Sequence, residues 1–369
     1  MGQERNTSIA IAKGIAIILM VMGHAECPGV LMNFIYLFHM PLFFITAGYF
    51  FSQKNVDQPW DFCRKRFKGL YVPFVKWSLF FLLIHNLMFH IGVLNETYGN
   101  WEGGVTHPYT LRQALQRAVH IVFSMGGYDE FLAGAFWFFR ALLISSILFL
   151  VLYRLVDGKT TWLRGWRTAA VIGAAALGFA ALKIGYGLKV NVVQGGIRET
   201  WGIAFFALGV IYRHVEDAVG FDRRKWWYWV ALTLSVAVLV AGTCLHWAGM
   251  NLAPKLIDVA TLPLTGLAGF FVVHQLSRLI DSRECRLRRA LAHCGEMTLY
   301  IYVFHIIAFK VVSLLKIWWY GLDYRQVGCH MVIHEHSGDI FWILYTVAGV
   351  GLPLLWMAAY ATFRRRVAS

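Results

Sequence analysis

The sequence predicts an all-helical protein that crosses a membrane about ten times, and its composition is the first reason. Of its 369 residues, 58% are hydrophobic and only 15% are charged. A water-soluble domain with so few polar side chains could not cover its own surface. Aromatic residues make up 16% of the chain and include 15 Trp, which suits a protein with Trp and Tyr at both membrane interfaces. No linker or low-complexity segment interrupts the chain, so we expect one integral-membrane domain over residues 1–369.

Runs of about 20 apolar residues are the second reason, because each is long enough to cross a bilayer as a helix. The candidate spans are residues 8–25, 31–52, 70–92, 132–155, 168–186, 197–214, 226–247, 257–280, 297–316 and 339–363. The first run is interrupted by Lys13 and ends in His-Ala-Glu-Cys, without the small-residue cleavage site of a signal peptide, so we expect a retained helix. Residues 110–124 are too short and too polar to span, and predict an amphipathic helix along the interface.

Lysine and arginine are concentrated in alternate connecting segments, and this orients the bundle. The basic segments are Arg5, residues 53–69, 156–167, 213–225 and 278–289, and the tail Arg364–Arg366. By the positive-inside rule these segments lie in the cytoplasm, and so do both termini. Basic loops beside anionic lipid headgroups explain the net charge of +14. We therefore expect the lipid bilayer as a partner, and no nucleic acid.

Several ionisable residues lie inside the predicted spans. Lys13 and His24 are eleven residues apart, which on a helix makes three turns plus about 20°, so they share one face about 16 Å apart along the axis. His39, Arg140 and His305 stand in the second, fourth and ninth spans at overlapping depths. Ionisable residues inside a bilayer are costly and usually face a protein interior or a water-filled path. The pattern predicts one internal site.

These residues belong to motifs that resemble the acyltransferase 3 family of membrane acyltransferases. Lys13 and His24 match its Arg-x10-His signature, with Lys in place of Arg. The stretch FHMPLFFITAGYFF, Phe38–Phe51, resembles the family's second helix, including Gly48. RKRFKGLYVPF, AFWFFRALL and GEMTLYIYVFH are similar to its basic segment, its Trp-Phe helix and its late helix. Lys within AKGI is most similar to the fucose 4-O-acetylase-like branch, although Ala10 stands where that branch commonly has Asp.

The resemblance implies a membrane O-acetyltransferase in a bacterial inner membrane. Such an enzyme moves an acetyl or other acyl group from cytoplasmic acyl-CoA to a hydroxyl of a sugar, in a cell-surface or exported polysaccharide or in a glycolipid. Acetyl-CoA would then be a donor substrate, and no permanently bound cofactor is expected. The alternative is a proton-coupled secondary transporter of a sugar or a lipid-linked intermediate, in which the same Lys, His and Arg would form a relay. The internal repeat common in transporters is not visible in the sequence.

The catalytic roles follow from what acyl transfer needs. A general base must lie near the acceptor hydroxyl, in a pocket that excludes water. A neutral imidazole suits that role near pH 7, so we assign it to His24, with Lys13 as an electrostatic or channel-lining partner. The carboxylate that orients His24 is sought among residues at outer helix ends, which are Glu26, Glu199 and Asp258, and Glu199 is preferred.

The donor and acceptor ends are assigned by charge and by aromatic character. Cationic side chains suit the phosphates of CoA, and those assigned to the donor are Arg64, Lys65, Arg66, Lys68 and Arg140. The residues assigned to the acceptor sugar are His39, His305, Trp318 and Tyr324, the last two because aromatic rings stack on sugar faces.

No metal site is expected. His330, His334, Glu335 and His336 fit no metal-site template, and the six cysteines contain no Cys-x-x-Cys pair.

Overall fold

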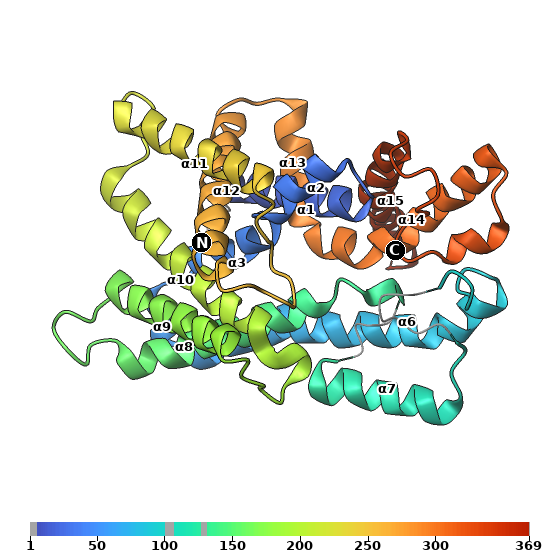
Figure 1. Cartoon of the computed structure of the whole chain (residues 1–369), viewed down its shortest axis with the longest axis horizontal. Coiled ribbons are helices and arrows are strands. Elements are labelled where there is room, and N and C mark those ends of the chain that lie inside the picture. Colours follow the sequence, from blue (N-terminus) through green and yellow to red (C-terminus); the bar gives the residue numbers. More distant parts are fainter. Residues whose placement is uncertain (1–5, 100–106, 127–130, 369) are drawn as a thin grey trace. The chain divides into compact units, whose positions relative to one another are not determined.

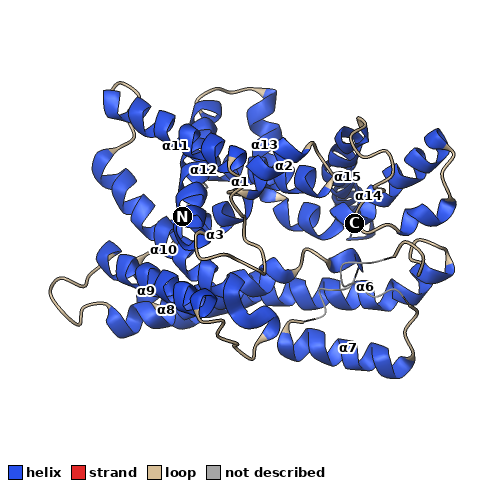
Figure 2. Cartoon of the chain, viewed as in Figure 1, coloured by secondary structure: helices blue, strands red, loops and turns tan. Residues whose placement is uncertain are grey.

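The computed structural model describes residues 6–99, 107–126 and 131–368, and in these residues every regular element is a helix (Figures 1 and 2). The predicted interfacial helix is present as α7 (Leu111–Ser124). The Thr110 side chain accepts the Gln113 N–H, and the Gln113 side chain accepts the Thr110 N–H in return. This capping box satisfies backbone donors at the helix start and fixes where α7 begins.

Nine helical segments of the described residues are long and apolar enough to cross a membrane. They are α1 (Thr7–His24), the pair α2 (Gly29–Tyr36) and α3 (His39–Tyr49), the run of α5 (Pro59–Arg66), η1 (Phe67–Tyr71) and α6 (Val72–His90), then α8 (Trp137–Val156), α9 (Trp166–Gly185), α11 (Trp226–Cys244), α12 (Asp258–Asp281), α14 (Thr298–Tyr320) and α15 (Phe341–Ala368). Each corresponds to a predicted span. The structure therefore confirms a polytopic helical membrane protein.

The remaining predicted span, residues 197–214, is the helix α10 (Ile197–Val219). Its 23 residues are long enough to cross a bilayer. Its charges lie at the two ends, with Glu199 in the first turn and Glu216 and Asp217 near the last. These charges make α10 less apolar than the nine segments named above. Both termini share one side of the membrane only if α10 is a further crossing, so that expectation stays a prediction.

The basic segment 53–69 is helical, which corrects the expectation of a loop. It forms α4 (Gln53–Asp57) and α5, and α5 continues through the π-turn η1 into α6. Pro59 opens α5, a position where its missing N–H costs nothing. Lysine and arginine are good helix formers, so the apolar helix that follows extends backward through the basic residues.

The described chain packs as two compact units that alternate along the sequence. One comprises residues 1–32, 73–137 and 283–369, and the other comprises residues 33–72 and 138–282. In the first unit α1 packs against α13 (Arg286–Glu296) so closely that a Cβ on Gly14 would lie 2.0 Å from the Leu291 carbonyl oxygen, and one on Gly295 would lie 1.8 Å from that of Ala10. Glycine is therefore required at this crossing.

A second glycine contact joins α3 and α10 in the second unit. A Cβ on Gly48 would lie 1.9 Å from the Phe206 carbonyl oxygen, and one on Gly209 would lie 2.1 Å from that of Ile45. Small residues let membrane helices approach this closely and gain van der Waals contact. Gly48, one of the residues on which the resemblance was based, thus has a packing reason.

The helix is broken between α2 and α3, within one predicted span. Two carbonyl groups at the break are satisfied by side chains: Ile35 O lies 2.9 Å from Nδ1 of His39, and Leu37 O accepts the Thr265 hydroxyl at 3.2 Å. The Phe38 ring fits at Gly269, where a Cβ would lie 2.2 Å from that side chain. Backbone groups freed inside a membrane need partners within the protein, and these contacts supply them.

Candidate functional site

The imidazole rings of His24 and His305 form a pair in the first unit. His24 ends α1 and His305 lies on α14. Nδ1 of His24 is 2.9 Å from Nε2 of His305, and the rings stack with centroids 5.1 Å apart. His305 is fully buried, whereas His24 is partly exposed. The pair thus has one member fixed in the interior and one that a substrate can reach.

The other nitrogen of His305 determines which ring donates. Its Nδ1 is 2.8 Å from the Tyr302 carbonyl oxygen, which can only accept a hydrogen bond, so Nδ1 carries the proton and Nε2 of the neutral ring accepts. The proton between the rings then belongs to Nδ1 of His24. The lone pair of neutral His24 is therefore on Nε2, where it can accept a proton from a hydroxyl.

Aromatic and backbone contacts hold His305 in place. The Phe309 ring meets it edge-on with centroids 5.6 Å apart. The Tyr302 hydroxyl donates to the Ala135 carbonyl, and the Tyr302 ring stacks on Phe136 with centroids 5.8 Å apart. A ring confined in this way can orient a neighbour, so His305, expected at the acceptor sugar, is in a position to orient His24 instead.

Lys13 lies on the part of α1 that packs against α13, between Ala10 and Gly14. Its side chain is partly buried. Because α1 is one continuous helix, Lys13 stays about 16 Å along the axis from His24. The two side chains cannot both contact one small group, and the spacing suits a long substrate that lies along α1.

The segment between α14 and α15 is bound to α14 by two buried lysines. The Lys310 ammonium group donates to the Cys329 carbonyl at 2.5 Å, and that of Lys316 is 3.2 Å from Oδ2 of Asp339. His334 in the same segment contacts Glu26, two residues beyond His24. This segment therefore packs over the end of α1 that carries His24.

The last turn of α14 and the segment that follows it contain the predicted aromatic and histidine residues. Trp318 lies in the last turn of α14 and Tyr324 begins η4 (Tyr324–Gly328), and both side chains are exposed. Burial, together with the positive charge of Lys310, lowers the pKa of His330 to about 4. Among the described residues no three His, Cys, Asp or Glu side chains are grouped to hold a metal ion.

A buried ion pair joins α8 to α10 in the second unit. Nη1 of Arg140 is 2.5 Å from Oε1 of Glu199 and donates to the Val193 carbonyl at 3.2 Å. Both side chains are less than a tenth exposed. Arg140 and Glu199, predicted separately for donor binding and for orienting His24, are thus partners of each other, and those two roles stay predictions. Asp258, in the first turn of α12, accepts the Lys255 N–H at 2.6 Å.

The four basic residues of α5 and η1 do not act alike. Arg64, Lys65 and Lys68 are exposed and, at spacings of one, three and four residues, lie on one side of the helix. Arg66 points the other way, with its guanidinium 5.0 Å from the centroid of the Phe62 ring and 3.5 Å from the Ala47 carbonyl oxygen. Arg66 therefore makes packing contacts and the other three side chains face outward, and the donor role of all four stays a prediction.

The sequence analysis missed a buried polar network in the second unit. The Tyr49 hydroxyl donates to Oε2 of Glu216 at 2.8 Å, and Oε1 of Glu216 is 3.6 Å from Nη1 of Arg278. Beside them the Tyr212 hydroxyl is 2.9 Å from Nδ1 of His274. The available signal was Glu216, an acidic residue just after a predicted span, in a segment that also holds Asp217 and Asp222 among its basic residues.

The described helices form a polytopic membrane protein, and the hydrogen bonds of the His24–His305 pair leave the lone pair of neutral His24 on Nε2. Residues 6–362 match the model of the family Acyl_transf_3, described as an acyltransferase domain. Because the match covers nearly the whole chain, the protein belongs to the acyltransferase 3 family and is a membrane acyltransferase. None of the curated proteins and none of the solved structures compared with the chain matches it.

Proposed function

We propose that the protein transfers an acetyl group from cytoplasmic acetyl-CoA to a hydroxyl of a sugar in an exported polysaccharide or a glycolipid, and that it does so in a bacterial inner membrane. The observation that supports this most directly is the pairing of His24 with His305, because it leaves a basic nitrogen on a partly exposed ring. The motifs around Lys13 add the sugar specificity, through their similarity to the fucose 4-O-acetylase-like branch.

The reaction begins when the acceptor hydroxyl gives its proton to Nε2 of His24. The hydroxyl oxygen attacks the thioester carbonyl carbon, a C–O bond forms, and the carbonyl electrons move to oxygen. The intermediate collapses, the C–S bond breaks and CoA leaves as a thiolate, which takes the proton back from His24. The products are the O-acetyl sugar and CoA thiol. A positioned base typically contributes 10²–10⁴-fold to such a step.

The donor-binding residues are assigned by charge and by spacing along α1. We place the phosphates of the donor at the exposed cations Arg64, Lys65 and Lys68, because such groups favour phosphate. Lys13, separated from His24 by about 16 Å along α1, is assigned to the channel wall and not to the reacting carbonyl. We assign the exposed side chains of Trp318 and Tyr324 to binding of the acceptor sugar.

The test is release of free CoA thiol from acetyl-CoA by the purified protein in lipid nanodiscs, with a fucoside as the first acceptor. His24→Ala should reduce turnover by about 10²–10⁴-fold while acetyl-CoA still binds. His90→Ala, which removes an exposed imidazole at the end of α6, should retain wild-type turnover. The wild-type rate should fall at acidic pH, because a protonated imidazole has no lone pair with which to accept a proton.

Turnover of His24→Ala within a few-fold of wild type would make His24 a packing residue and reject this mechanism. Acceptor-independent movement of a sugar across the membrane, with no CoA released, would instead support transport.

A further inference from the structure

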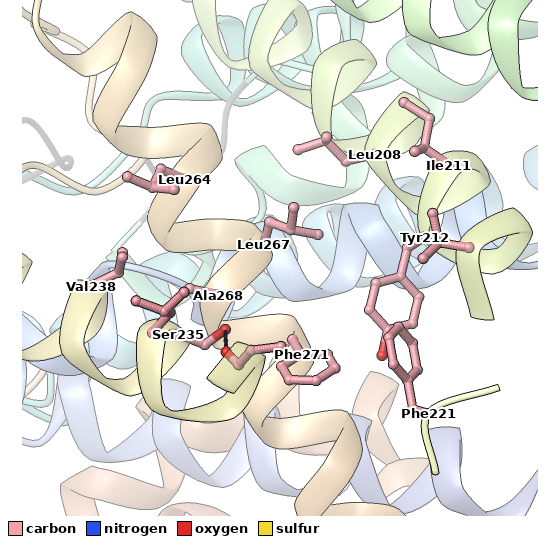
Figure 3. A pocket seen from close by; sticks show the side chains of 13 residues that line it. Leu208, Ile211, Tyr212, Phe221, Ser235, Val238, Leu264, Leu267, Ala268 and Phe271 are labelled. Carbon is pink, nitrogen blue, oxygen red and sulfur yellow. Dashed lines mark hydrogen bonds between the residues drawn. The ribbon is translucent and has the colours of Figure 1, made fainter. Parts of the chain in front are cut away.

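An apolar groove runs along the second unit between α10, α11 and α12 (Figure 3). Its volume is about 320 Å³. Leu208 and Ile211 line it from α10, Val238 from α11, and Leu264 and Phe271 from α12, and these side chains point toward the same space in Figure 3. The groove is independent of the His24 pair, which belongs to the first unit.

The two polar side chains in the groove have internal partners. The Ser235 hydroxyl donates to the Ala231 carbonyl at 2.8 Å within α11. The Tyr212 hydroxyl is 2.9 Å from Nδ1 of His274 and accepts a hydrogen bond from the Gln275 amide at 3.3 Å. A sugar or nucleotide in this groove would leave its own polar groups unpaired, at considerable cost. The groove therefore suits a hydrocarbon chain.

The groove lies on helices that lipid acyl chains can reach. Its walls include α11 and α12, both candidate membrane spans. Leu234 and Leu264 on its rim are 60% and 47% exposed. Residues exposed on membrane spans meet lipid, so acyl chains are the molecules that reach this groove most readily.

The chain that leaves the groove at Phe221 carries a net positive charge. Phe221 lines the groove, and the residues that follow it in sequence are Asp222, Arg223, Arg224 and Lys225. The nearby Arg213 is already paired with Asp217 at 2.9 Å. Arg224 and Lys225 are exposed, and neither forms an ion pair within the part of the chain that the structure describes.

We propose that the groove binds one acyl chain of a phospholipid whose anionic headgroup pairs with Arg224 and Lys225. Phe221 lines the apolar groove and stands three residues before Arg224 in sequence, which matches the order of chain and headgroup in such a lipid. The site lies outside the acyl-transfer chemistry, so its failure would leave that proposal untouched.

Native mass spectrometry of the full-length protein in detergent tests this with two lipids of identical chains, phosphatidylglycerol and phosphatidylcholine. Phosphatidylglycerol should bind at least about fivefold more tightly, and Arg224→Gln and Lys225→Gln should each remove roughly fivefold, the value of one surface cation near an anionic headgroup. Lys159→Gln, an exposed lysine in another connecting segment, should have no effect.

The groove itself is tested by filling it. Ala231→Phe and Val238→Phe should each abolish the preference, whereas Val240→Phe, at a residue of α11 outside the groove that is 53% exposed, should not. Two groove variants are used so that one remains informative if the other fails to fold. Equal binding of the two lipids, displacement of the lipid by inorganic phosphate, or an equal effect of Val240→Phe would each overturn the proposal.

Discussion

The ring of His24, at the end of α1, donates its Nδ1 proton to Nε2 of His305, 281 residues away in sequence, across 2.9 Å. The Tyr302 carbonyl fixes the proton on the far side of His305. A buried, neutral imidazole thus selects the tautomer of an accessible one. A carboxylate in the same position would stabilise the imidazolium form as well, whereas His305 chiefly sets orientation.

Removing the acceptor at position 305 should reduce turnover without affecting donor binding. His305→Leu should lower kcat by about 10–100-fold, the usual cost of losing a group that orients a functional ligand, and leave the KM for acetyl-CoA unchanged. His305→Gln should recover part of the loss, because its amide oxygen can accept the His24 proton. Steady-state kinetics on the three proteins checks this, and wild-type turnover in the Leu variant would contradict it.

The charge at Lys13 should matter more than its exact shape. Lys13→Arg should keep substantial activity, because it preserves the cation and the family signature has Arg there. Lys13→Ala should lose most activity, although the protein still inserts. The measurement is CoA release from membranes with matched expression of both variants. Equal activity of the two variants would show that the charge has no role.

The exposed cations of α5 and η1 should act on the donor alone. Arg64→Gln with Lys68→Gln should raise the KM for acetyl-CoA by roughly tenfold or more, since charge-assisted contacts to phosphate are strong, and should leave the acceptor KM unchanged.

Two comparisons test the donor assignment. With acetyl-pantetheine, which lacks the nucleotide phosphates, wild type and variant should have the same KM. Lys54→Gln, at an exposed lysine of α4, serves as the charge-matched control. An equal rise in KM for both donors would argue against a phosphate site on this helix.

Breaking the ion pair between Arg140 and Glu199 should destabilise the protein strongly, whereas replacing both residues by apolar ones should not. Glu199→Gln leaves a buried guanidinium without its counter-charge and should lower stability by about 3–5 kcal/mol. Arg140→Met combined with Glu199→Met should restore most of it. Asp217→Asn, which breaks the exposed pair with Arg213, should cost no more than about 1 kcal/mol. Reversible unfolding in mixed micelles measures all three, and a cost for Glu199→Gln equal to that of Asp217→Asn would be inconsistent with the burial.

His330 should make stability depend on pH. Its pKa in the folded protein is lowered to about 4, below the value of about 6.5 in an unfolded chain. Between these values the unfolded state binds more protons, so stability should rise with pH through this window and fall on acidification. His330→Asn should flatten the dependence of the unfolding free energy from pH 6.5 to 4, whereas His90→Asn should not. If the pH dependence of the unfolding free energy is the same in His330→Asn, the His330 side chain is solvated in the folded protein.

The membrane spans could be predicted from local sequence because hydrophobic length is a local property. Helix α10 was found for the same reason, although Glu199 and its other charges lower its apolar character. Two local features were missed. The helix through Arg64 was read as a loop because polarity hid its helix-forming residues, and the break before His39 lies inside an unbroken apolar run.

The candidate site could be predicted only in part, because its contacts are not local. Lys13 and His24 were found through helical periodicity within α1. The partner of His24 lies on another helix, and a single sequence contains no record of which helices touch. For this reason His305 was assigned to the sugar and Glu199 to His24, whereas the structure pairs His24 with His305 and Glu199 with Arg140.

The glycine crossings bear on how the protein can move during turnover. At Gly14 and Gly295, and again at Gly48 and Gly209, two backbones touch with no room for a side chain. Rotating or sliding either helix by one residue would replace a glycine with a larger neighbour and drive it into a carbonyl group. Each crossing therefore behaves as a fixed joint. The strain of admitting a donor and releasing a product must be taken up elsewhere, and spectroscopic distance probes across either joint should record one unchanging separation through the catalytic cycle.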